Sequence, residues 1–156
     1  MATEIERKFL VKGDEYREQA QGRRYRQAYL STDKERVVRV RVVDQEAWLT
    51  IKGRTRGVSR AEFEYPIPVE DAIDMLENLC QQPVIDKTRY RLPLGDHVWE
   101  IDEFHGVNDG LVVAEIELED EDQPFEKPDW LGDEVSGDPR YFNANLIAHP
   151  YRDWSE

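Results

Sequence analysis

The chain has 156 residues, one cysteine and a formal net charge of −13, because 34 acidic side chains outnumber 21 lysines and arginines. Its hydrophobic fraction of 39% is below the roughly 45–50% of typical globular chains, so we expect one modest domain over residues 1–156 rather than a repeat array or a multidomain enzyme. One cysteine excludes an internal disulfide framework. The acidic excess would repel a nucleic-acid duplex or an anionic membrane unless the bases gather in one place, so neither is an expected partner.

The sequence has neither the pattern of a membrane span nor that of a secretory leader. No window approaches the roughly 18 uncharged apolar residues of a membrane helix, and the N-terminus is charged where a leader is apolar. We therefore expect a cytoplasmic protein. The three histidines lie far from one another and from Cys80 in the sequence, so no structural zinc site is predicted.

Alternation of apolar and polar side chains with a period of two dominates the chain and predicts eight strands. These run over Thr3–Lys12, Arg24–Leu30, Val37–Val43, Trp48–Lys52, Ser59–Ile67, Ile85–Leu92, Val98–Phe104 and Val112–Glu119. Most breaks between them are short turn sequences, so neighbouring strands are expected to pair in antiparallel hairpins. The expected fold class is mainly β, of the α+β type with only a few helices.

One clear helix is predicted over Glu70–Cys80, where the apolar side chains share one face and Pro83 follows. Cys80 lies beside that face and has no base near it in the sequence, so we interpret it as a small buried side chain without a chemical role. Shorter helices are predicted over Asp14–Ala20 and Tyr141–Ile147.

The strands share a pattern in which one side is charged and the other apolar. In the first strand Glu4, Glu6 and Lys8 take one side, while Ile5 and Phe9 take the other. The same parity in the later strands gives eight carboxylates and eight bases, namely Glu4, Glu6, Glu62, Glu64, Glu100, Asp102, Glu115 and Glu117, with Lys8, Arg39, Arg41, Lys52, Arg60, Lys87, Arg89 and Arg91. The charged side therefore sums to zero in a strongly acidic chain.

This charged side has two interpretations. For any single strand, the solvated side of an antiparallel sheet is the simpler one. Across seven strands, however, the polar positions are almost all ionic, which favours a closed eight-stranded antiparallel barrel with the charges inside and the helices and termini outside. Buried charges must be paired or bound to ligands. Carboxylates suit Mg²⁺ or Mn²⁺ and bases suit phosphate oxygens, so the pattern predicts a site for metal and polyphosphate.

Seven short charged blocks follow one another along these strands. They are Glu4-Ile5-Glu6-Arg7-Lys8, Arg39-Val40-Arg41, Leu49-Thr50-Ile51-Lys52, Glu62-Phe63-Glu64, Lys87-Thr88-Arg89-Tyr90, Glu100-Ile101-Asp102 and Ala114-Glu115-Ile116-Glu117. The first is similar to the ExExK signature of the CYTH domain, or triphosphate tunnel metalloenzyme, superfamily, and the others resemble its later blocks in the same order. The resemblance extends almost from end to end of the chain.

The resemblance implies an eight-stranded tunnel that binds a linear triphosphate with divalent metal, Mg²⁺ or Mn²⁺, at two ions per site. It implies that phosphate oxygens are bound by Lys8, Arg39, Arg41, Lys52, Lys87 and Arg89. It implies that metal is held by Glu4, Glu6, Glu62, Glu64, Glu115 and Glu117, with Asp102 as a further ligand or as an acid behind the ligands. The predicted catalytic cations are Lys8, Arg39, Lys52 and Lys87, and Lys87 is also the candidate general base.

The activity expected from the resemblance is hydrolysis of inorganic tripolyphosphate to pyrophosphate and orthophosphate. The chain is short, and its four tryptophans, Trp48, Trp99, Trp130 and Trp154, show no clustering that predicts a pocket for a base or a thiazole. The alternatives are an adenylate cyclase of class IV, a thiamine or nucleoside triphosphatase, and a polyphosphate-binding module without catalysis, which the many carboxylates argue against. The sequence leaves open the physiological triphosphate, the metal, and the choice between a monomer and a homodimer.

Overall fold

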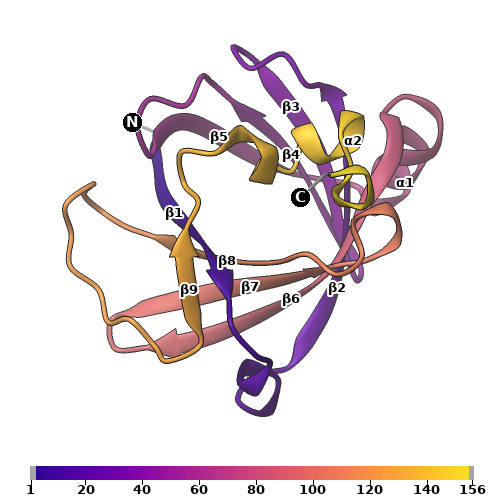
Figure 1. Cartoon of the computed structure of the whole chain (residues 1–156). Helices are drawn as coiled ribbons and strands as arrows, with labels where there is room; N and C mark the ends of the chain where they lie inside the picture. Colours follow the sequence, from indigo (N-terminus) through magenta and orange to yellow (C-terminus); the bar gives the residue numbers. More distant parts are fainter. Residues whose placement is uncertain (1–2, 155–156) are drawn as a thin grey trace.

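The computed structural model describes residues 3–154. Its strands are β1 (Thr3–Val11), β2 (Gly22–Ser31), β3 (Val37–Val43), β4 (Glu46–Lys52), β5 (Ser59–Ile67), β6 (Gln81–Leu94), β7 (His97–Phe104), β8 (Val112–Glu117) and β9 (Leu131–Glu134). The order β5-β4-β3-β2-β6-β7-β8-β1 closes into a ring because β1 also pairs with β5, and β9 lies beside β1 (Figure 1). The prediction of a closed eight-stranded antiparallel barrel is confirmed. The predicted domain over residues 1–156 includes two residues at each end that lie outside the described range.

Strand β1 closes the barrel because it changes partner along its length. One of its edges pairs with β8, from Glu6 opposite Glu117 to Leu10. The other edge pairs first with β5, where Ile5 lies opposite Ser59, and then with β9, beginning at Phe9. A strand with three partners leaves the ring without an open edge at this point.

The helices are short and lie outside the barrel or at one end of it (Figure 1). The α-helices are α1 (Val69–Asn78) and α2 (Asn145–Ala148), and the 3₁₀ turns are η1 (Glu15–Glu18), η2 (Gly106–Asn108), η3 (Pro139–Tyr141) and η4 (Tyr151–Asp153). Helix α1 packs on the outer face of β2, β3 and β4 through Ala72 and Leu76, with Cys80 buried beside them. The helix predicted over Tyr141–Ile147 is instead two pieces, η3 and α2. Within residues 3–154 no helix is long and apolar enough to cross a membrane.

The outer faces of β1, β6, β7 and β8 form the largest apolar core. Its centre is Trp99, which is fully buried and packs edge-on against Trp130 with the ring centroids 5.4 Å apart. Phe9 and Phe125 lie on the same ring at 5.6 Å and 5.8 Å. The prediction that no tryptophans cluster was therefore wrong, because the segment leading into β9 folds back over the barrel and brings Trp130 to Trp99.

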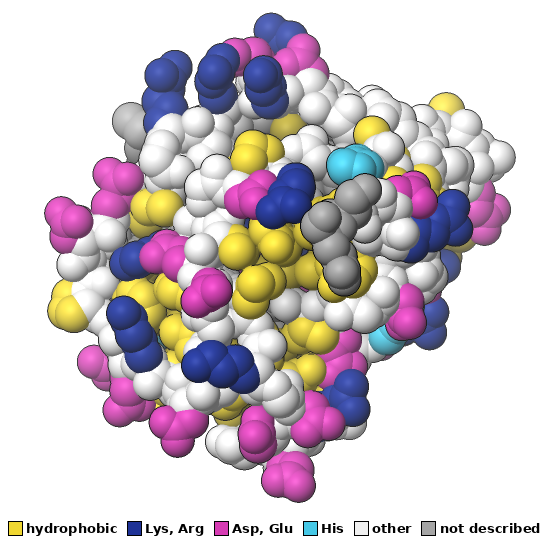
Figure 2. Space-filling model, viewed as in Figure 1, with side chains coloured by type: hydrophobic (Ala, Val, Ile, Leu, Met, Phe, Trp, Pro, Cys, Tyr) yellow, Lys and Arg dark blue, Asp and Glu magenta, His cyan; other side chains and the backbone are white. Residues whose placement is uncertain are grey.

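The inside of the barrel changes from charged to apolar at one end. On the inward side of five strands, apolar side chains stand two residues beyond the polar ones, namely Leu10, Tyr29, Ile85, Phe104 and Val113. The C-terminal segment, residues 139–154, packs Tyr141, Leu146 and Ile147 against them. Figure 1 shows this segment crossing the opening of the barrel, and Figure 2 shows hydrophobic side chains gathered in the middle of the same face. The C-terminal segment is thus a plug with its own apolar core.

Trp99→Ala is expected to destabilise the fold by about 3–5 kcal/mol, because it leaves a cavity in the outer core. Trp99→Phe is expected to cost much less, because the buried indole N–H of Trp99 has no hydrogen-bond partner among the described residues. Urea unfolding followed by circular dichroism measures both. The control is Leu79→Ala at a residue 67% exposed, for which we expect a change within about 0.5 kcal/mol. Equal losses for Trp99→Ala and Leu79→Ala would contradict this account of the core.

Candidate active site

The barrel encloses a cavity of about 410 Å³ that is lined by side chains from all eight strands of the ring. Of the predicted inward-facing charges, all except Asp102 and Arg91 line this cavity. The lining residues with predicted roles are Glu4, Glu6, Lys8, Arg39, Arg41, Lys52, Glu62, Glu64, Lys87, Arg89, Glu115 and Glu117. The charged side of the strands therefore faces an enclosed space rather than bulk solvent, which favours the barrel interpretation over the solvated sheet.

Carboxylates gather where β1, β7 and β8 meet. The strand register places Glu6 opposite Glu117 and Glu100 opposite Glu115. Burial raises the pKa of Glu6, and the negative charge of Glu115 raises it further. Burial also raises the pKa of Glu4 and of Glu117, and the charges of Glu4 and Glu6 add to the effect on Glu117. This corner of the cavity holds an excess of negative charge that a cation would relieve.

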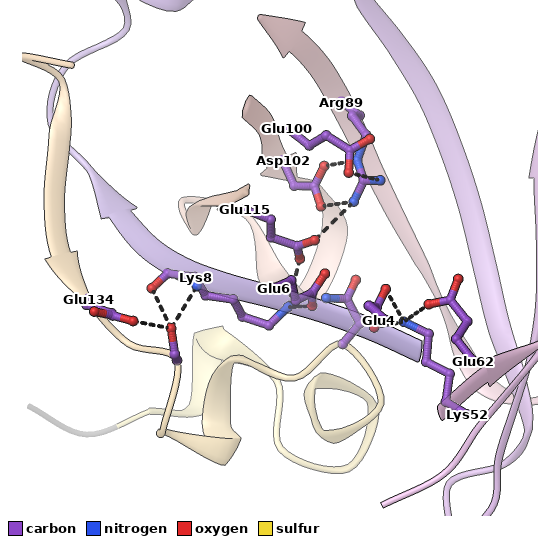
Figure 3. A network of polar contacts seen from close by, with 12 residues as sticks. Glu4, Glu6, Lys8, Lys52, Glu62, Arg89, Glu100, Asp102, Glu115 and Glu134 are labelled. Carbon is purple, nitrogen blue, oxygen red and sulfur yellow. Dashed lines mark hydrogen bonds and ion pairs between the residues drawn. The ribbon is translucent and has the colours of Figure 1, made fainter. Parts of the chain in front are cut away.

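Two lysines stand among these carboxylates (Figure 3). Lys8 Nζ lies 2.7 Å from Glu115 Oε1 and 3.2 Å from Glu6 Oε1, and Lys52 Nζ lies 3.2 Å from Glu4 Oε1. Burial opposes the charge of Lys8, but the two carboxylates more than offset it and raise its pKa. Across residues 3–154, no three acidic, histidine or cysteine side chains are already placed to hold one metal ion. A divalent ion would share these oxygens with the lysines or displace the ammonium groups from them.

Asp102, on β7, anchors two cations of the neighbouring strand β6. Its carboxylate accepts hydrogen bonds from Arg89 at 2.7 Å and 2.8 Å and lies 2.8 Å from Lys87 Nζ. Burial opposes its ionisation, but Arg89 and Lys87 lower the pKa of Asp102 to about 2. Asp102 is 1% exposed and does not line the cavity, so it lies behind Lys87 and Arg89, which do.

The surroundings of Lys87 and Arg41 disfavour the positive charges of these side chains. Burial lowers the pKa of Lys87 to about 7, with Arg89 and Arg41 adding to the effect and Asp102 opposing it. Burial and the charges of Arg39 and Arg89 lower the pKa of Arg41 to about 10. This side of the cavity holds more positive charge than its own acids neutralise, so an anion would stabilise it.

Two buried atoms in the cavity wall lack hydrogen-bond partners among the described residues. One is Arg39 Nε, a donor, and the other is Glu62 Oε2, an acceptor whose nearest cation is Lys52 at 3.5 Å. The rest of the Arg39 side chain is held by Thr50 at 3.3 Å and approaches Glu64 at 3.6 Å. A donor and an acceptor left open in one cavity match an anionic ligand and a cationic ligand, respectively.

The strand pattern did not indicate Gln27 as an uncharged residue of the wall, whereas it offered Tyr29 as a candidate for the rim of the tunnel or for ordinary packing. Tyr25, Gln27 and Tyr29 of β2 take the same inward parity as the charges, and the Tyr25 ring lies between the guanidinium carbons of Arg41 and Arg89 at 5.1 Å and 5.0 Å from its centroid. Only their inward position in the alternation of the strand could have indicated them, because the second predicted strand contributes no charged side chain to the inward side.

A second group of lining residues comes from the C-terminal plug, which the strand pattern did not indicate, and from two loops. One of these loops is the basic stretch Gly53–Gly57, which the sequence offers either as a collector of anions at the tunnel mouth or as an ordinary exposed loop. The plug contributes Phe142, Asn143, Ala144 and Asn145 to the cavity, and the loops after β2 and β4 contribute Lys34, Arg54, Thr55 and Gly57 at its mouth. The strand pattern does not point to these plug residues, because Phe142, Asn143, Ala144 and Asn145 carry no charge and belong to no strand. Arg54 is held by Glu35, with Nη1 2.6 Å from Oε1.

A closed barrel with a basic wall facing an acidic corner defines a class of protein that binds a multiply charged anion together with cations. The chain matches the CYTH domain over residues 2–151 and belongs to that family, which confirms the resemblance seen in the sequence. It is 53% identical, over 156 residues and 100% of both chains, to the inorganic triphosphatase of Acetivibrio thermocellus. It is 38% identical over 149 residues to the inorganic triphosphatase of Nitrosomonas europaea, covering 92% of this chain and 96% of the relative. The crystal structure of an inorganic triphosphatase, 34% identical, aligns with a TM-score of 0.62 over 92% of this chain and 96% of that one.

Glu117→Gln is expected to leave the metal-free protein at least as stable as the unmodified chain, because the amide removes repulsion from Glu4 and Glu6. Phosphate release from tripolyphosphate with Mg²⁺ is expected to collapse, because an amide is a poor Mg²⁺ ligand. Thermal unfolding with and without Mg²⁺ and tripolyphosphate measures the first effect, and a phosphate assay measures the second.

The matched control is Glu119→Gln, an exposed acid just beyond β8, which is expected to change neither quantity. Full turnover and unchanged ligand-induced stabilisation in Glu117→Gln would show that Glu117 is an ordinary surface carboxylate.

Proposed function

We propose that the protein hydrolyses inorganic tripolyphosphate to pyrophosphate and orthophosphate with the help of a divalent metal ion. The observation that carries this proposal is the two-sided cavity, in which a basic wall and an acidic corner face each other inside one closed barrel. The full-length similarity to an inorganic triphosphatase supports the same activity.

The basic wall binds the phosphates. Arg39, Arg41, Lys87 and Arg89 form the wall itself, and Lys8 and Lys52 join it from among the carboxylates; all six line the cavity. The open Nε donor of Arg39 meets a phosphate oxygen, and Arg41 gains the anionic neighbour that its surroundings lack. Charge-assisted hydrogen bonds of this kind are the strongest that proteins make to phosphate, and guanidinium groups make them in pairs.

The acidic corner fits a divalent metal such as Mg²⁺ or Mn²⁺, with two ions per site. The residues that would hold it are Glu4, Glu6, Glu62, Glu64, Glu115 and Glu117. Two observations support this set. Glu62 Oε2 accepts no hydrogen bond from residues 3–154 and has Lys52 as its nearest cation at 3.5 Å, and Glu4, Glu6 and Glu117 repel one another. A bound metal ion neutralises charge on the phosphates and lowers the pKa of an attacking water.

The reaction follows from how the chain holds its substrate. The basic wall fixes the linear triphosphate and leaves its terminal phosphoryl group toward the acidic corner, in line for attack by water. The bond from the terminal phosphorus to the bridging oxygen breaks as the bond to water forms, and the basic wall retains the charge of the departing pyrophosphate. Asp102 keeps Lys87 and Arg89 in place throughout. The assignment of Lys87 as the general base stays a prediction.

Two other functions use the same cavity. An adenylate cyclase would release cyclic AMP and pyrophosphate from ATP, whereas a binding module would release nothing. Tyr29 and Phe142 are the aromatic side chains of residues 3–154 that line the cavity, and they stand near its plugged end rather than forming a stacked pair for a base. The acidic corner argues against binding alone, because anion binding is better served by bases.

Tripolyphosphate is expected to be hydrolysed faster than ATP, and EDTA is expected to abolish the activity, because the cavity selects phosphates and depends on a cation in its acidic corner. The measurement is release of orthophosphate and pyrophosphate from tripolyphosphate, ATP, thiamine triphosphate and pyrophosphate, each with Mg²⁺, Mn²⁺ or EDTA. Cyclic AMP as the main product from ATP would assign the protein to the cyclases instead.

Lys52→Ala and Arg39→Ala are each expected to lower kcat/KM for tripolyphosphate by roughly ten- to a hundredfold, because a charge-assisted contact contributes about 1.5–3 kcal/mol. Steady-state kinetics measures the loss. Lys127→Ala and Arg23→Ala remove the same side chains from exposed positions and are expected to keep normal kinetics. Normal kinetics in Lys52→Ala and Arg39→Ala would remove these two residues from the phosphate site.

A further inference from the structure

The C-terminal plug places a carboxamide directly on Lys87. Asn143 lies between η3 and α2, and its Oδ1 accepts hydrogen bonds from Lys87 Nζ at 2.8 Å and from Gln27 Nε2 at 3.1 Å. An ammonium group only donates, so the contact fixes which end of the carboxamide faces Lys87. Asn143, from the last part of the chain, therefore helps to fix the position of the Lys87 side chain on β6.

This contact limits where the Lys87 ammonium group can point. The group has three N–H bonds; one contact is taken by Asp102 at 2.8 Å and another by Asn143 at 2.8 Å. The Phe104 ring covers a further side, with its centroid 5.5 Å from Nζ. Lys87 is 1% exposed yet lines the cavity, so its third N–H is the one available to a ligand.

Asn143 is also connected to Arg41, on the same side of the cavity as Lys87, through Gln27. The Oε1 atom of Gln27 accepts from Arg41 Nε at 2.8 Å, while its Nε2 donates to Asn143 and to Tyr29 Oη, the latter at 3.2 Å. Gln27 is fully buried, and both ends of its amide are used. The two carboxamides thus join Arg41 and Lys87 by a chain of hydrogen bonds without adding charge.

The backbone around Asn143 is held by packing that does not involve Lys87. Tyr141 and Leu146, on either side of it, are buried in the apolar end of the barrel. The turn between them is closed by a hydrogen bond from Leu146 N to Phe142 O at 3.2 Å, and Asn145 Nδ2 donates to Pro139 O at 2.8 Å. The plug can therefore impose a position on Lys87 rather than merely follow it.

We propose that Asn143 is a positioning residue that holds the Lys87 ammonium group so that its remaining N–H faces the phosphates, making the C-terminal plug a part of the phosphate site. The inference rests on the proposed function in one respect, namely that the ligand is a triphosphate. It predicts that the C-terminal plug, which closes one end of the barrel, also completes the phosphate site.

The test is a double-mutant cycle on binding, measured by calorimetry with inorganic tripolyphosphate in excess EDTA. Asn143→Ala is expected to weaken binding by roughly tenfold in the normal background. In the Lys87→Ala background it is expected to cause no further loss, because Asn143 acts through Lys87. The same loss in both backgrounds would show a purely structural role and overturn the proposal, as would an absence of binding to the unmodified protein.

A second variant separates shape from hydrogen bonding. Asn143→Leu keeps the branched shape and the number of heavy atoms of the side chain but removes the acceptor, so it is expected to weaken binding as much as Asn143→Ala. Binding as tight as that of the unmodified chain would overturn the proposal. Asn78→Ala, which removes the same amide from the exposed end of α1, is the control and is expected to leave binding unchanged. Hydrolysis by the unmodified protein with Mg²⁺ tests the proposed function separately, because the cycle measures binding without turnover.

Discussion

The fold depends on one constraint, which is that a closed barrel must hold many charged groups out of bulk water. Buried ions are tolerated only when opposite charges meet at close range. The antiparallel register achieves this by setting bases and acids opposite each other on neighbouring strands, as with Lys8 and Glu115, Lys52 and Glu62, or Arg89 and Asp102. Local neutrality of the wall is thus a property of strand pairing. The excess charge that remains, acidic in one corner and basic on the other side, is where ligands are needed.

Apolar contacts must then be made elsewhere, because the lumen cannot serve as the hydrophobic core. The outer faces of the strands provide it, beneath α1 on one side and around Trp99 on the other. At the end of the lumen where Tyr29 and Phe104 make the wall apolar, the C-terminal segment fills the space. The barrel is therefore covered outside and plugged inside, and only the middle of its interior is left for chemistry.

The strands and the charged wall were predictable because both follow from parity. Once Glu4, Glu6 and Lys8 are assigned to one side of a strand, the same side of every later strand is determined. Trp130 and β9 were not predictable, because their place depends on a loop that returns over the barrel. Gln27 and Asn143 were missed for a different reason, since an uncharged amide becomes informative only when its neighbours in space are known. The sequence thus indicated the charges of the site, Asp102 included, but not the uncharged amides that hydrogen-bond to them.

The change of partner along β1 also bears on synthesis. Glu6 lies on β1, the first of the described strands, yet its partner Glu117 lies on β8, much later in the chain. Before β8 is made, the strands can form only an open sheet with one charged and one apolar side. The pairing of β1 with β8 joins distant parts of the chain, and contacts of this kind form slowly. The pairing of β1 with β8 also brings the carboxylates Glu6 and Glu117 together. A chain without β8 therefore lacks the complete carboxylate cluster, and the apolar side chains that β8 covers in the outer core stay exposed to water.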